Sequence, residues 1–60
     1  MSRFTWLKNF EQHLKSGTKE DLEKDIEYCK YRIKIAKLKS HIKTWEQWIK
    51  LAENAIFDRF

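Results

Sequence analysis

Apolar residues recur at alternating spacings of three and four along the stretch from Lys19 to Phe60, which contains neither glycine nor proline. This spacing is typical of one face of a helix. Two such series run through the stretch. The first comprises Leu22, Ile26, Cys29, Ile33, Ala36 and Ser40, and the second comprises Tyr28, Tyr31, Ile35, Leu38, Ile42, Trp45, Ile49, Ala52 and Ile56. At 100° per residue the two series point to nearly opposite sides of residues 22–40, so a helix here must be covered twice.

The N-terminal residues carry a shorter helical pattern. Apolar residues at Trp6, Leu7, Phe10 and Leu14 predict a helix over about residues 4–15, with Ser2 or Thr5 as its cap. Gly17 suits the left-handed position that often closes a helix. Thr18 followed by Asp21 resembles a capping box with Asp in place of Glu. We therefore expect one helix to end, and the next to begin, at residues 16–18.

The first helix, at about 12 residues and roughly 18 Å, has the length needed to fold back over the face from Leu22 to Ile33. The second face then needs another cover. A continuous helix over about residues 19–58 would be roughly 60 Å long and would require a second copy along that face. Alternatively the chain bends near residues 40–44, where Thr44 and Gln47 resemble a second capping box. Residues 45–58 would then form a third helix.

The absence of Gly, Pro, Asn and Asp from residues 40–44 favours the continuous helix. The predicted fold is therefore all-α: a short helix (about 4–15) folded back on a long helix (about 19–58), which dimerises as an antiparallel bundle. The alternative is a monomeric three-helix bundle with the bend at 40–44.

Length and composition support one small helical domain over residues 1–60 that is stabilised by association. A single cysteine excludes an internal disulfide, and two histidines with one cysteine are a poor metal-binding set. No apolar run reaches the roughly 20 residues of a membrane span, and the first residues lack the apolar core of a secretory signal. We expect a complete, reduced, cytoplasmic protein without metal or cofactor.

Charge is arranged in blocks along the long stretch. Residues 19–29 carry a net charge of −3, and residues 30–43 carry six basic residues and no acid. In a homodimer, antiparallel packing would place the acidic block of one chain against the basic block of the other, so the blocks favour an antiparallel arrangement.

The basic block is also the candidate site for nucleic acid. Its cations could follow a phosphate backbone with little sequence preference, or they could be the solvated flanks of a buried helix. The candidate phosphate contacts are Lys30, Arg32, Lys34, Lys37, Lys39 and Lys43.

Protein contacts are predicted along the second apolar face and at nearby aromatic residues. Trp48 and Phe57 lie at the edge of that face and are candidate exposed anchors, since aromatic residues are favoured in interfaces. The seam for self-association or partner binding comprises Tyr28, Tyr31, Ile35, Leu38, Ile42, Trp45, Ile49 and Ile56.

The sequence predicts no catalytic residues, and we do not expect an enzyme. Cys29 lies on an apolar face, where a thiol is usually inert. His13 and His41 have no acid or nucleophile at helical spacing and are expected to be solvated. The predicted function is that of a small self-associating protein, a dimer, which binds an unidentified protein as an adaptor, modulator or inhibitor. The alternative is nucleic-acid binding by the basic block, and a membrane is the least suited partner.

Overall fold

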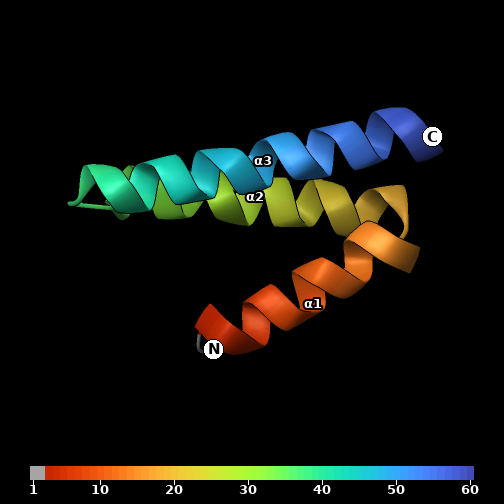
Figure 1. Cartoon of the computed structure of the whole chain (residues 1–60), viewed down its shortest axis with the longest axis horizontal. Helices are drawn as coiled ribbons and strands as arrows, with labels where there is room; N and C mark the ends of the chain where they lie inside the picture. Colours follow the sequence, from red (N-terminus) through yellow and green to blue (C-terminus); the bar gives the residue numbers. More distant parts are fainter. Residues whose placement is uncertain (1–2) are drawn as a thin grey trace.

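The computed structural model describes residues 3–60, which form three helices: α1 (Arg3–Ser16), α2 (Lys19–Ile35) and α3 (Lys39–Arg59). Helices α2 and α3 lie side by side and run in opposite directions, while α1 crosses beside them at an angle (Figure 1). The Cα radius of gyration is 11.1 Å. The chain is therefore all-α, and both α1 and α3 contact α2.

The predicted continuous helix over residues 19–58 is wrong, and the alternative three-helix arrangement is correct in kind. The bend lies at residues 36–38, a few residues before the predicted region 40–44. Ala36 and Leu38 have extended backbone conformations, with ψ of 139° and 134°. Thr44, predicted to cap a third helix, lies inside α3, where its Oγ1 donates to the carbonyl oxygen of Ser40 at 3.0 Å.

The bend has no local capping signal, which explains why the sequence pattern missed it. Within the described chain, no side chain caps the start of α3 at Leu38. Two effects favour the break. Like charges three or four residues apart, as in Lys30, Lys34 and Lys37, each destabilise a continuous helix by about 0.2–0.5 kcal/mol. Folding back at Ala36 also buries Trp45 and Ala52, and burial of apolar surface outweighs local helix preference.

The junction between α1 and α2 follows the sequence closely. The Asp21 backbone N–H donates to Thr18 Oγ1 at 3.1 Å, and the Thr18 N–H donates to the Asp21 carboxylate at 3.2 Å. The predicted capping box is thus confirmed. Ser2, one of the proposed caps of the first helix, lies outside the described residues, and Thr5 lies within α1.

Gly17 has a different role from the predicted left-handed cap, because no glycine among the described residues has a positive φ. A Cβ atom at Gly17 would lie 2.7 Å from both Cα and the carbonyl oxygen of His13. The residue is also buried, and its N–H donates to that carbonyl at 2.8 Å. Gly17 is therefore needed for close backbone packing at the end of α1.

Large aromatic side chains fill the space where α1 diverges from the α2–α3 pair. Trp6 of α1 is at the centre, with its ring centroid 5.0–5.5 Å from those of four other rings; its neighbours are Phe10, Tyr28, Trp45 and Trp48. The sequence predicted that α1 would cover the face from Leu22 to Ile33. Helix α1 contacts Asp25, which lies on that face between Leu22 and Cys29, and it also contacts Tyr28 of the second apolar series.

Candidate interaction surfaces

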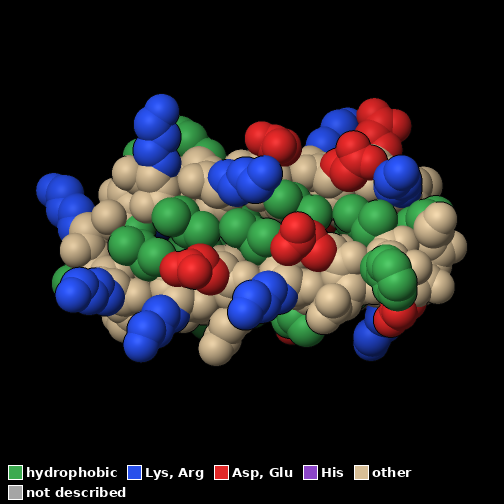
Figure 2. Space-filling model, turned by 90° about the horizontal axis from the view of Figure 1, so that it is seen from above, with side chains coloured by type: hydrophobic (Ala, Val, Ile, Leu, Met, Phe, Trp, Pro, Cys, Tyr) green, Lys and Arg blue, Asp and Glu red, His purple; other side chains and the backbone are tan. Residues whose placement is uncertain are grey.

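The bend brings the whole basic block to one end of the molecule. We call this the turn end: the last turns of α2, residues 36–38 and the first turns of α3. Figure 2 shows Lys and Arg side chains around it at the left, whereas Asp and Glu side chains begin nearer the middle. Five of the six predicted phosphate-contact residues are exposed there: Lys30, Lys34, Lys37, Lys39 and Lys43.

Arg32, the sixth of these residues, is half-buried and makes a different contact. Its guanidinium carbon lies 5.4 Å from the centroid of the Trp45 ring. This is the geometry of a cation–π interaction, and it holds the Arg32 side chain against the core. Arg32 is therefore less available to a ligand than the five exposed lysines.

Three apolar side chains of the predicted seam are also exposed at the turn end. Tyr31 is 56% exposed, Ile35 48% and Leu38 57%. Tyr31 and Ile35 are four residues apart and therefore share one face of α2, and Leu38 follows in the bend. Together with the five exposed lysines they form a mixed apolar and basic surface.

The fold divides the rest of the predicted seam. Trp45 is buried, while Tyr28, Ile42, Ile49 and Ile56 are partly buried. The two predicted anchors also separate. Trp48 packs on Trp6 and Phe10, whereas Phe57 is 87% exposed near the end of α3.

The opposite end, where the α1–α2 junction meets the C-terminal turns of α3, contains a polar contact that the sequence did not predict. We call this the junction end (Figure 1, right). Nδ1 of His13 donates to the carboxylate of Asp25 at 2.7 Å. The expectation of a solvated His13 is therefore wrong, because its acidic partner comes from another helix; His41, by contrast, is exposed.

Asp25 is buried between α1 and α2, with 7% of its surface exposed. Burial raises the pKa of its carboxyl, and the hydrogen bond with His13 opposes this rise. The sequence did contain a signal for this position. Leu22, Asp25 and Cys29 have helical spacing, so the acid lies on the same face as two buried residues.

Cys29 lies one turn beyond Asp25 and is fully buried. Burial raises the pKa of its thiol to about 12, and the nearby Asp25 carboxylate adds to the rise. Because the thiolate is the nucleophilic form, this thiol packs in the core rather than acting as a nucleophile.

Arg59 makes the second polar contact that sequence patterns missed. Its guanidinium donates to the carbonyl oxygens of His13 at 3.0 Å and Leu14 at 3.2 Å, and also to that of Gly17. The last carbonyls of a helix lack partners within the helix, and a cation there also interacts favourably with the helix dipole. Arg59 therefore caps α1 from the end of α3. Backbone acceptors so distant along the chain leave no pattern in the sequence.

Searches for sites and relatives returned nothing that assigns a function. No group of three or more His, Cys, Asp or Glu residues within 3–60 could hold a metal ion. None of the helices formed by these residues is long and apolar enough to cross a membrane. Comparison with protein-family models, curated proteins and solved structures found no match to this chain. The evidence for its function therefore lies in its own surfaces.

Proposed function

We propose that this chain is a self-associating helical module that binds a protein partner through its turn end. The observation that carries the proposal is the exposure of Tyr31, Ile35 and Leu38 at the same end as five exposed lysines. Exposed apolar side chains cost free energy in water, and a protein partner would remove them from it. Tyrosine is, in addition, one of the residues enriched at interface hot spots.

The charge at this end indicates the chemistry of the partner. Residues 30–43 carry six cations and no acid, so the best-matched partner is an acidic segment. Tyr31, Ile35 and Leu38, which we call the apolar triplet, require that this segment also present apolar side chains. An acidic amphipathic helix meets both conditions, because its charged and apolar residues lie on separate faces. Charge would speed the encounter, and apolar burial would supply most of the affinity.

The proposal can be tested with two synthetic peptides of identical composition, rich in Glu and Leu. One has a helical amphipathic order and the other is scrambled. We expect the amphipathic peptide to bind more tightly, with an affinity that falls as salt rises. Fluorescence anisotropy of labelled peptide at about 50 and about 300 mM salt measures both effects. Absence of binding to the amphipathic peptide at low salt would contradict the proposal.

The chain offers a matched control for the apolar part of the surface. Leu38→Ser removes a leucine at the turn end, whereas Leu51→Ser removes a leucine of similar exposure elsewhere on α3. We expect Leu38→Ser to weaken peptide binding by about tenfold, the effect of losing a contact worth about 1.4 kcal/mol. Leu51→Ser should leave binding unchanged.

Nucleic-acid binding is the second candidate, because the bend gathers cations from α2 and α3 at one end. In that case the lysines would contact phosphates, and the apolar triplet would contribute little. Titration with single- and double-stranded DNA and with RNA at the same two salt concentrations separates the candidates. If the double variant Lys34→Gln/Lys37→Gln abolishes nucleic-acid binding while Leu38→Ser leaves it intact, nucleic acid is favoured as the partner. The opposite sensitivity would favour the acidic protein segment.

A further inference from the structure

A second apolar surface runs along α2 and α3 on the face opposite α1. Figure 2, which views the molecule from this side, shows a continuous row of hydrophobic side chains with charged side chains on both edges. Five isoleucines lie at seven-residue intervals on the two helices, and each is partly buried. They are Ile26 and Ile33 of α2, and Ile42, Ile49 and Ile56 of α3. We call this row the isoleucine stripe.

Contacts of α1 place the isoleucine stripe away from α1. Helix α1 contacts α2 at Asp25 and Tyr28 and contacts α3 at Trp45 and Trp48. Each further residue turns a helix by 100°. Ile26 is therefore turned 100° from Asp25, and Ile49 is turned 100° from Trp48 and 40° from Trp45, on the side of Trp45 away from Trp48. The stripe is distinct from the apolar part of the turn-end surface, because Ile35 is turned 200° from Ile33.

The edges of the stripe carry opposite charges in its two halves. Toward the turn end, the exposed residues are basic: Lys30 and Lys34 on α2 with Lys39 and Lys43 on α3. Toward the junction end, the exposed residues are mainly acidic: Glu20, Glu23 and Glu27 on α2 with Glu53 on α3. Four cations therefore lie along one half and four carboxylates along the other, with Glu46 and Lys50 between them on α3.

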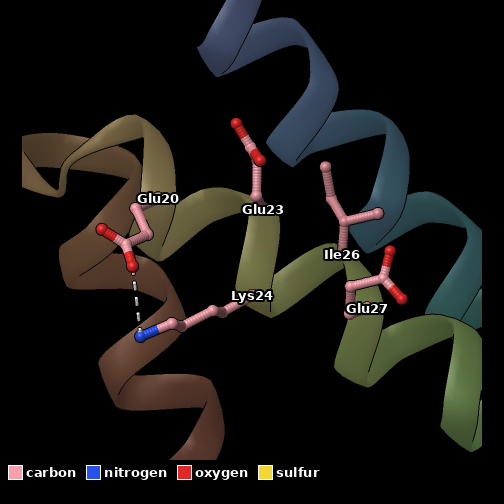
Figure 3. A pocket seen from close by; sticks show the side chains of 5 residues that line it. All are labelled: Glu20, Glu23, Lys24, Ile26 and Glu27. Carbon is pink, nitrogen blue, oxygen red and sulfur yellow. Dashed lines mark ion pairs between the residues drawn. The ribbon is translucent and has the colours of Figure 1, made fainter.

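The acidic half contains a surface hollow beside the stripe. Glu23, Ile26 and Glu27 line it together with Glu20 and Lys24. Figure 3 shows Glu23 and Ile26 pointing toward α3, with Glu27 beside them. Lys24 pairs with Glu20 at 3.7 Å, which leaves Glu23 and Glu27 to receive a cation from another molecule. An apolar wall with carboxylates at its rim suits a lysine, whose long stem is apolar and whose head is charged.

We propose that a second copy of this chain docks on the isoleucine stripe in an antiparallel orientation. The proposal rests on the self-association proposed above and assigns its surface and direction. A two-fold axis perpendicular to the stripe places the turn end of each copy over the junction end of the other. The four cations of each turn end then lie over the acidic half of the other copy. With the axis along the stripe, cations would face cations, so charge selects the antiparallel form. The apolar triplet at both turn ends stays available.

Complementary charge reversals at exposed positions test this geometry without touching the core. Variant A carries Glu23→Lys and Glu27→Lys, and variant B carries Lys30→Glu and Lys34→Glu. Each alone places like charges together in the antiparallel dimer. Because several exposed charge pairs are reversed at once, we expect dimerisation to weaken by about tenfold or more. An equimolar mixture of A and B restores opposite charges on both sides, so its dimerisation should return to near the wild-type level.

Sedimentation equilibrium measures the association, and circular dichroism verifies that each variant is folded. Lys8→Glu/Glu11→Lys, an exposed pair of reversals on α1, is the matched control and should dimerise like the wild type. A dimer in which mixing A with B gives no recovery overturns the antiparallel docking but leaves self-association intact. A wild type that stays monomeric at millimolar concentration overturns both. Peptide binding at the turn end is measured separately on the wild type, because variant B reverses two lysines of that surface.

Discussion

The two ends of this bundle are built in different ways. At the junction end, specific contacts fix the chain: the Thr18–Asp21 capping box, the His13–Asp25 hydrogen bond and the three carbonyl contacts of Arg59. The turn end has extended residues at the bend, exposed apolar side chains and unbalanced positive charge. Specific polar contacts are thus concentrated at one end, and surface suited to a partner at the other.

This difference is expected when a small domain must both fold and bind. A 60-residue domain has little stability to spare. Residues selected for contact with a partner are exposed and contribute little to the isolated fold. Separating the two roles lets the turn end change without unfolding the bundle. Four tests show how complete the separation is.

A pair of leucine truncations should give the largest contrast. Leu22 is fully buried near the junction end, and Leu38 is exposed at the turn end. Leu22→Ala should lower the free energy of unfolding by about 2–5 kcal/mol, because it leaves a cavity in the core. Leu38→Ala should change it by no more than about 0.5 kcal/mol. Urea denaturation measures both, and similar losses would show that the turn end is packed as firmly as the junction end.

Gly17→Ala should give the next largest effect. The added methyl group would lie 2.7 Å from His13 backbone atoms, and relieving that overlap should cost about 1–3 kcal/mol. Ala36→Gly, at the bend, is the comparison. It removes a methyl group without any overlap and should cost only about 0.4–1 kcal/mol, through the greater freedom of the unfolded chain. If Gly17→Ala were neutral in denaturant titration, α1 could shift at its end without cost.

Two threonine substitutions compare a capping hydroxyl with one inside a helix. Thr18→Ala removes the cap of α2 and should cost about 1 kcal/mol, or roughly 4–8 °C in melting temperature for a domain of this size. Thr44→Ala removes a bond to the Ser40 carbonyl within α3, and should change stability by less than about 0.5 kcal/mol because alanine favours helix. Equal shifts in thermal melts would contradict the capping role of Thr18.

The last test concerns pH dependence rather than overall stability. Burial raises the pKa of Asp25 in the folded chain, against the opposing effect of its hydrogen bond with His13. Between the unfolded and folded pKa values the native state holds more protons, so this group makes stability fall as pH rises. Asp25→Asn does not ionise. The wild type should therefore lose stability relative to Asp25→Asn as pH rises from about 4. Melting temperatures of both proteins across pH 3–7 check the sign.

Sequence reasoning predicted the two ends unequally, for the same physical reason that they differ. The helix boundary at residues 16–18 was correct because Gly17, Thr18 and Asp21 act locally. The bend was misplaced because Ala36 and Leu38 carry no turn chemistry, and only the packing of α3 on α2 explains it. The need to cover α2 on both sides was visible in the apolar pattern. The pattern did not show which segments would pack on α2, since this depends on contacts between distant residues.

The contacts of Arg59 also constrain the order in which the chain can assemble. Its acceptor carbonyls lie 42 to 46 residues earlier in the chain. The α2–α3 pair, joined by a short bend, can close through nearby contacts, and such contacts form fast. The contacts of Arg59 with the end of α1, however, cannot form until residue 59 has been synthesised and α3 is in place. We therefore expect α1 to dock last during folding and to detach first during unfolding.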